Sequence, residues 1–296
     1  MDLIATGQTL GARVEGLDLA VPLNAGQVDQ LVQALGTHGV LEFPMQSLSA
    51  RNLRDFSANF GDLWVSPGGR AQVPGLPEVM ILSNIVADGK PVGLADAGQS
   101  WHTDMSYMPM VAHTNVLYGT KIPRRQGRAL GATQFRNMYA AYEGLPADLK
   151  RAIEGRTGRH DFEKFWEAMR KENGIRAPLT EEERRKRPPV AQPLVLTHPV
   201  TRAKVLYANP GYLTGVDGLP KAESDDIIEA LFEHQMRGEF LYEFTWSEHS
   251  VLMWDNICTI HNAVPDYTRD EHRYIERCQV MATRYYGPGG TLDPVH

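Results

Sequence analysis

Two stretches organise this chain: WHTD at residues 101–104 and WDNICTIH at residues 254–261. His102 and Asp104 are two residues apart, and alternate side chains of an extended strand point to the same face. If His261 folds back beside them, two imidazoles and a carboxylate meet with open positions opposite, an arrangement that suits non-haem Fe(II) in O2 activation. A His-x-Asp triplet alone is common by chance, so the rest of the chain has to support this hypothesis.

The composition is that of an ordinary globular protein. The chain has 296 residues, of which 42% are hydrophobic and 22% charged, and its net charge of −6 argues against nucleic-acid binding. We find no apolar run long enough to span a membrane and no signal-peptide pattern at the first residues. Two cysteines, Cys258 and Cys278, are too few for a disulfide framework, so we expect a reduced, cytoplasmic protein.

Hydrophobic periodicity predicts many short strands and a few helices, hence an α+β, β-rich barrel or sandwich with flanking helices in one domain, residues 1–296. Residues 159–190 change character, because EEERRKR at 181–187 is a dense charge run. This insertion is interpreted either as a solvated helical segment or as a lid over the site. Helices are expected at 24–38, 49–60, 134–143, 146–155 and 222–238, and strands at 40–43, 79–85, 114–121, 240–246, 250–254 and 277–285.

Two arginines follow His261. Arg273 and Arg277 are four residues apart, so on a strand both guanidinium groups point the same way. An arginine inside a barrel needs an anion, because an unpaired buried charge is costly, and its fork matches a carboxylate. The pair therefore indicates two anions near the metal, a carboxylate co-substrate and an anionic substrate, unless both arginines lie on the surface.

At this point the chain resembles the taurine dioxygenase and 2,4-dichlorophenoxyacetate dioxygenase group of Fe(II)/2-oxoglutarate-dependent oxygenases. The resemblance runs from about Gly11 to Tyr286, and the order and spacing of its blocks make it specific. The matching blocks are 11–23, 38–43, 56–63, 101–104, 206–212, 254–256 and 261–277.

The resemblance implies a double-stranded β-helix, or jelly roll, with His102, Asp104 and His261 as Fe(II) ligands. Arg273 would pair with the distal carboxylate of 2-oxoglutarate with help from Thr133, and Arg277 would bind the acidic group of the substrate. No catalytic residue beyond the metal ligands is implied. The reaction would consume O2 and 2-oxoglutarate, release succinate and CO2, and hydroxylate the substrate.

Where the family's taurine-binding site has polar and aromatic residues, this chain has Gly98 and SPGG at 66–69. We therefore expect another small organic acid, a carboxylate, sulfonate or sulfate ester, with Arg70, His113 and residues 105–108 as candidates for the pocket wall. Two alternatives stay open: the same chemistry on a cationic amino acid or betaine, and a metal-binding protein without turnover. By family resemblance we also expect a homo-oligomer.

Overall fold

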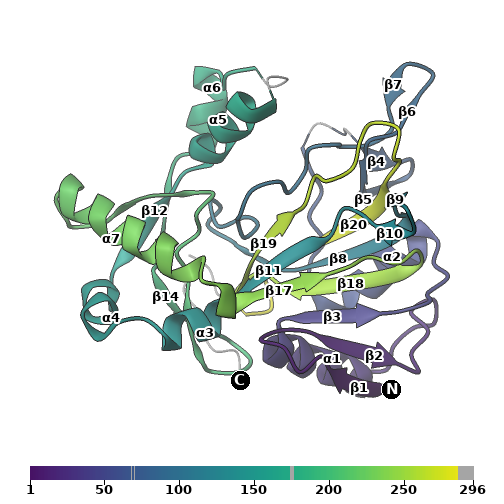
Figure 1. Cartoon of the computed structure of the whole chain (residues 1–296), viewed down its shortest axis with the longest axis horizontal. Helices are drawn as coiled ribbons and strands as arrows, with labels where there is room; N and C mark the ends of the chain where they lie inside the picture. The colour runs from purple at the N-terminus through teal and green to yellow at the C-terminus, as the bar shows by residue number, and fades with distance from the viewer. Residues whose placement is uncertain (68, 70, 174–176, 286–296) are drawn as a thin grey trace.

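An eight-stranded sheet, shown on the right of Figure 1, is the largest element of the computed structural model. The structure describes every residue except 68, 70, 174–176 and 286–296. Neighbouring strands run antiparallel, apart from the parallel pair β2 and β3. In sheet order the strands are β1 (Asp2–Ala5), β2 (Ala12–Glu15), β3 (Val40–Phe43), β18 (Ser250–Asp255), β8 (Ala112–Lys121), β20 (Tyr274–Met281), β5 (Leu76–Ser83) and β4 (Gln72–Val73).

Two helices, α1 (Ala25–His38) and α2 (Ala50–Ser57), cover one face of this sheet. Both start where the sequence predicts, because Asn24 and Ser49 each form a reciprocal capping box with the residue three positions on. Gly39 ends α1 at a φ of 68°, and a Cβ there would lie 2.7 Å from Leu10. The apolar faces of the helices pack on the sheet in one core cluster, and η1 (Ala58–Phe60) continues from α2.

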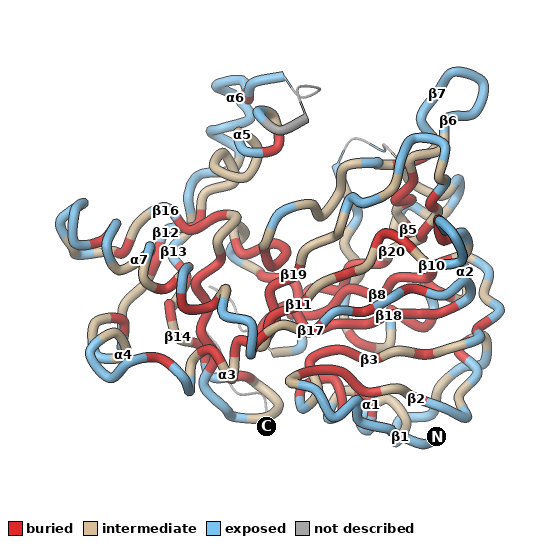
Figure 2. The backbone as a smooth tube through the Cα atoms, viewed as in Figure 1, coloured by how far each residue is buried: buried red, intermediate tan, exposed pale blue. Residues whose placement is uncertain are grey.

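A smaller sheet of three strands faces the opposite side of the large sheet. Its order is β17 (Leu241–Phe244), β11 (Thr133–Asn137) and β19 (Thr259–Ala263). A second core cluster lies between the two sheets, and it joins Phe135 and Phe244 to Leu252 and Ile275. Figure 2 shows buried residues concentrated along these central strands. The described chain is therefore a strand-rich α/β protein, and the site lies at one end of this inter-sheet core.

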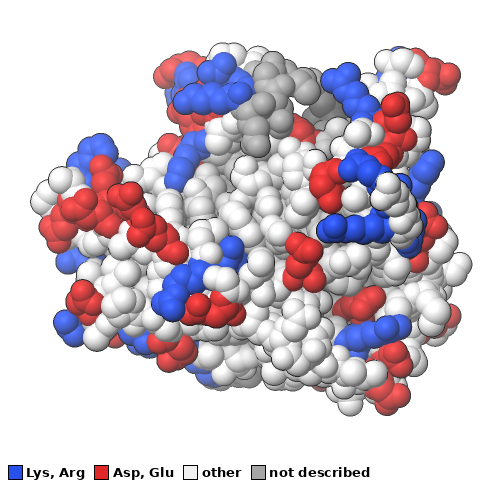
Figure 3. Space-filling view, in the orientation of Figure 1, with Lys and Arg blue, Asp and Glu red and all other residues white. Residues whose placement is uncertain are grey.

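Helices and short strands between β11 and β17 form a separate layer on the left of Figure 1. Its charged helices α5 (Phe162–Asn173) and α6 (Glu181–Lys186) stand at the top, and Figure 3 shows both signs of charge gathered there. None of the helices in the described ranges has the length and apolar character needed to cross a bilayer. The elements are α3 (Met138–Glu143), α4 (Ala147–Ile153), β12 (Thr157–His160), α5 (Phe162–Asn173), α6 (Glu181–Lys186), β13 (Val190–Pro193), β14 (Val195–Thr197), β15 (Lys204–Leu206), β16 (Leu213–Val216), α7 (Lys221–Gln235) and η2 (Gly238–Phe240).

Two hairpins complete the described elements: β6 (Val86–Ala87) pairs with β7 (Lys90–Pro91), and β9 (Arg124–Arg125) pairs with β10 (Arg128–Ala129). The helix predicted at 134–143 is wrong in its first turn. Residues 134–137 belong to β11, and Asn137 then caps α3. Pairing with β17 and β19 stabilises the extended form there, because strand formation depends on partners that local propensity does not include.

Candidate metal centre and co-substrate site

The three side chains that the sequence selects as metal ligands lie together. One ligand atom from each of His102, Asp104 and His261 falls within a group whose members are all within 4.8 Å of one another. All three residues are buried, and the two imidazole rings lie 4.3 Å apart between centroids. Two imidazoles and a carboxylate are a donor set that suits a divalent first-row metal.

Backbone pairing brings the two histidines together. His102 and His261 form an isolated antiparallel bridge, in which each backbone N–H donates to the other residue's carbonyl, at 3.0 and 2.7 Å. His261 lies within strand β19, which is not among the strands expected from the sequence. Residues 102–104 form the bridge and the start of a turn, so the expectation of a shared strand face for His102 and Asp104 is wrong. The bridge and the turn still aim both side chains at His261.

The protonation states of the group fit a metal. Burial, reinforced by the neighbouring His102, holds the pKa of His261 well below its ordinary value, so the ring stays neutral. Burial alone would raise the pKa of Asp104, but the hydrogen bond from His102 and the charge of Arg277 outweigh it and lower that pKa. Nδ1 of His102 lies 2.8 Å from the Ser100 carbonyl, so Nε2 is the nitrogen that faces Asp104, at 3.4 Å from its Oδ1.

An unsatisfied nitrogen adds to this fit. The buried Nδ1 of His261 has no hydrogen-bond partner among the described residues. Buried polar atoms without partners are rare in proteins and call for an explanation such as a missing ion or ligand. With a neutral ring, a charged carboxylate and an orphaned nitrogen, these residues could hold a divalent cation.

Aromatic rings pack around the two histidines. The ring of Trp254 lies 4.8 Å from that of His261, and the ring of Phe165 on α5 lies 5.4 Å from that of His102. Phe165 also stacks on Tyr212 at 5.0 Å. Thr103 donates to the backbone carbonyl of Asn256 and so ties the two sequence stretches to each other. The charged insertion therefore reaches the metal centre through Phe165.

Arg273 lies one residue before β20 and is only 6% exposed, so it is not a surface residue. Its Nε has no hydrogen-bond partner in the described part of the chain, and burial lowers the pKa of its guanidinium. A Cβ on Gly131, which has a φ of +72°, would lie 3.1 Å from that Nε. A buried, incompletely paired guanidinium with a glycine against it fits a site for a carboxylate.

Thr133 lies on β11, two residues after Gly131, and is 3% exposed. Its Oγ1 accepts a hydrogen bond from Nε1 of Trp246 at 3.0 Å. Because a hydroxyl both donates and accepts, Thr133 still has a proton to donate.

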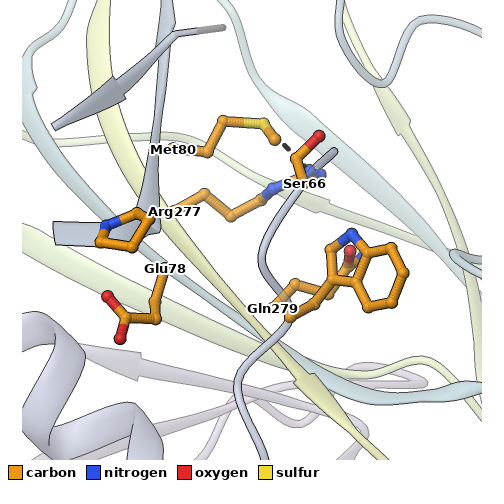
Figure 4. Close-up of a pocket in the computed structure, with 7 residues that line it drawn as sticks. Ser66, Glu78, Met80, Arg277 and Gln279 are labelled. Carbon is orange, nitrogen blue, oxygen red and sulfur yellow. Dashed lines mark hydrogen bonds between the residues drawn. The ribbon is translucent and has the colours of Figure 1, made fainter. Parts of the chain in front are cut away.

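Arg277 points into the same interior from β20. Its Nη1 is 3.5 Å from Oδ2 of Asp104, and its Nη2 donates to the sulfur of Met80 at 3.3 Å. Figure 4 shows the guanidinium beside Ser66 and Met80 in a small pocket, with the Glu78 carboxylate turned away from it. The Nε has no hydrogen-bond partner among described residues. The pocket thus presents a positive group next to the metal centre.

The remaining candidates for the pocket wall lie in different places. His113 is buried elsewhere, 3.7 Å from Asp255, so that expectation is wrong. Met105 is buried and Tyr107 half-buried, and the ring of Tyr107 lies 4.9 Å from that of Tyr212. Residue 70 falls outside the described ranges.

A second group, His198, Asp255 and Cys258, also has its ligand atoms within 4.8 Å of one another. Nδ1 of His198 accepts from the backbone N–H groups of Val200 and Thr201, both at 3.2 Å, so its proton sits on Nε2. That proton donates to Asp255, which also accepts from the N–H groups of Ile257 and Cys258. Since these donors and acceptors already satisfy one another, the group stabilises the turn before β19 and offers no free ligand.

The chain is similar to several known dioxygenases over most of its length. A 2,4-dichlorophenoxyacetate dioxygenase of Cupriavidus pinatubonensis, described as alpha-ketoglutarate-dependent, is 33% identical over 84% of this chain and 87% of its own. An (S)-phenoxypropionate/alpha-ketoglutarate-dioxygenase of Delftia acidovorans is 28% identical over 90% of each. A solved taurine dioxygenase of Burkholderia xenovorans is 30% identical, with a TM-score of 0.77 over 98% of this chain and 92% of its own. The solved structure of AAD-2 with Mn(II) and N-oxalylglycine is 28% identical, with a TM-score of 0.80 over 95% and 98%.

The chain is an alpha-ketoglutarate-dependent dioxygenase, an oxidoreductase that uses Fe(II), O2 and 2-oxoglutarate. It belongs to the family of taurine catabolism dioxygenases TauD, TfdA, whose model matches residues 4–279.

Proposed function

We propose that this enzyme hydroxylates a small organic acid, with His102, Asp104 and His261 holding Fe(II). The observation that carries the proposal is a pair of arginines: Arg273 is buried with an unsatisfied Nε, and the half-buried Arg277 lies 3.5 Å from Asp104. The two facing sheets then form a double-stranded β-helix, with the metal centre at one end of its core.

Each arginine has its own anion in this proposal. Arg273 binds the distal carboxylate of 2-oxoglutarate, since its guanidinium is buried and its Nε has no hydrogen-bond partner among the described residues, and Thr133 donates a hydrogen bond to the same group. Arg277 binds the acidic group of the substrate in the pocket with Ser66 and Met80. A cationic substrate would be repelled by Arg277, which disfavours amino acids with a positive side chain and betaines.

The bound iron and 2-oxoglutarate supply the oxidation: O2, 2-oxoglutarate and a substrate C–H bond become a C–OH group, succinate and CO2. The protein's residues place the substrate and exclude water. Arg277 fixes the acidic end of the substrate, and the aromatic rings of Phe165, Tyr107 and Tyr212 cover the ligands from the side of the insertion. These rings favour a substrate with an apolar or aromatic body.

The test is a screen of carboxylates, sulfonates and sulfate esters for substrate-dependent succinate release by the Fe(II)-loaded enzyme, with product masses to identify hydroxylation. For an acid that responds, Arg277→Gln should raise KM by about 10- to 100-fold, the effect of losing a charged hydrogen bond. Arg51→Gln, at an exposed residue of α2, is the matched control. If no acid stimulates succinate release, or if Arg277→Gln leaves KM unchanged, the proposal is wrong.

A further inference from the structure

The two oxygens of Asp104 have different surroundings. Oδ1 lies 3.4 Å from Nε2 of His102 and so faces the histidines. Oδ2 accepts hydrogen bonds from Nδ2 of Asn115 at 2.7 Å and from Nε2 of Gln279 at 2.9 Å. Nη1 of Arg277 adds a third contact to Oδ2, this one from a positive charge, at 3.5 Å. One oxygen is therefore directed to the metal centre and the other is already occupied by donors.

The two amides come from the centre of the large sheet. Asn115 on β8 and Gln279 on β20 are direct partners in the antiparallel ladder, and both are buried. Gln279 also shares a strand face with Arg277 and lines the same pocket, as Figure 4 shows. Because paired strands in a packed core move little, the two amides donate to the carboxylate from fixed positions.

The orientation of Asn115 supports a dedicated contact. Its Oδ1 has no hydrogen-bond partner among the described residues, although the side chain is fully buried. A buried acceptor without a partner is unfavourable, so the amide orientation must be determined by its Nδ2 contacts, of which the one to Asp104 at 2.7 Å is much shorter than the one to Oδ1 of Asn256 at 3.5 Å. This hydrogen bond therefore fixes the orientation of both side chains, the Asn115 amide and the Asp104 carboxylate.

We propose that Asn115 and Gln279 are positioning residues that occupy Oδ2, so that Asp104 binds the metal through Oδ1 alone. A carboxylate that offered both oxygens to the ion would compete with the co-substrate and O2 for it, whereas one with Oδ2 occupied would not. Neutral amides suit this task, since they add no positive charge beside a dication and remain in place when Arg277 engages an anionic substrate.

The test uses Gln279→Met and Asn115→Leu, which remove each donor while roughly keeping side-chain volume. Gln235→Met is the matched control, because Gln235 is also buried, and its amide atoms have no partners among the described residues. We measure Mn(II) affinity by the electron paramagnetic resonance of the free ion, and the affinity of the Mn(II)-loaded protein for 2-oxoglutarate by calorimetry. Both readouts are independent of turnover.

Each donor variant should lose about 10- to 100-fold in Mn(II) affinity, as is typical when a ligand's supporting partner is removed, and should also bind 2-oxoglutarate more weakly. Gln235→Met should keep both affinities within about twofold, whatever its thermal stability. If Gln279→Met melts earlier but binds Mn(II) and 2-oxoglutarate as the wild type does, the amide has only a structural role and the inference is wrong. Should Asn115→Leu fail to fold, Gln279→Met decides alone.

This inference rests on the proposed ligand set but not on the proposed substrate. A wild-type protein that binds no Mn(II) would contradict the ligand set itself. A wild type that binds Mn(II) tightly, with equal binding by both donor variants, would contradict only the role of the amides.

Discussion

Replacing Arg273 with methionine separates a ligand-binding arginine from a structural one. Methionine keeps much of the length and the apolar stem but removes the guanidinium, which is 6% exposed with an unsatisfied Nε. Burying a charge without a full partner is unfavourable, and well-packed apolar replacements of buried charges are often neutral or stabilising. Without 2-oxoglutarate, Arg273→Met should therefore melt at the wild-type temperature or above it.

The stabilisation that 2-oxoglutarate gives should, in contrast, be smaller in Arg273→Met than in the wild type. At 100 times its Kd, a ligand stabilises the wild type by about 2.7 kcal/mol, which corresponds to a Tm rise of about 5 °C in a chain of this size. Loss of the buried carboxylate contact costs about 3 kcal/mol, or about 150-fold in Kd. The same concentration then stabilises Arg273→Met by only about 0.3 kcal/mol, a shift below about 1 °C.

The assay is thermal melting of the Mn(II)-loaded protein over a titration of 2-oxoglutarate, since Mn(II) in place of Fe(II) is expected to avoid turnover. Arg51→Met, at an exposed position on α2, should keep the wild-type response. The reasoning is refuted if Arg273→Met loses several degrees without ligand and still shows the full shift with 2-oxoglutarate. That outcome would make Arg273 a structural residue.

Three further changes test other parts of the site. His102→Ala should abolish both Fe(II) binding and succinate production with unchanged circular dichroism, and persisting turnover would contradict its role as a ligand. Gly131→Ala should raise the KM for 2-oxoglutarate about tenfold, because a Cβ at φ +72° would lie 3.1 Å from Nε of Arg273. Gly127→Ala, at φ +82° with nothing within 4 Å, has the strain without the contact and should leave KM unchanged. Burial lowers the pKa of His113 to about 4, whereas an exposed histidine in the unfolded chain has a pKa of about 6.5. Between these two pH values the unfolded chain binds a proton that the folded protein does not. The free energy of unfolding should therefore fall as the pH drops from about 6.5 towards 4, by about 1.4 kcal/mol per pH unit. Urea midpoints at pH 7 and pH 5 check this, and His113→Asn should flatten the difference; an equal difference in the variant would exclude His113 as its source.

Local signals in the sequence were sufficient for part of the fold. Helices α1 and α2 begin where Asn24 and Ser49 predict, because a capping box involves only residues three apart. The grouping of His102, Asp104 and His261 was also predictable, since residue type and motif order select them from ten histidines. In each case the information lies in a few neighbouring residues or in the chemistry of the side chains.

Long-range pairing could not be predicted in the same way. Residues 134–137 have a helical pattern but form β11, and His261 lies in β19 because that strand pairs with β11, with Phe135 opposite His261. Asn115 and Gln279 were missed because nothing local links an amide on β8 to one on β20. Gln279 did carry one signal, since it is two residues after Arg277 and therefore shares its face.

The backbone bridge between His102 and His261 has a consequence for how the enzyme acquires its metal. Its two hydrogen bonds belong to the polypeptide and do not require an ion, so the ligands are preorganised and loading costs little ordering entropy. The bridge also joins distant parts of the chain. A polypeptide that has not yet extended through β19 lacks one imidazole, so the full ligand set cannot form before this strand has been made and has paired with residue 102. Truncations that stop before β19 should therefore bind the metal much more weakly than the whole chain.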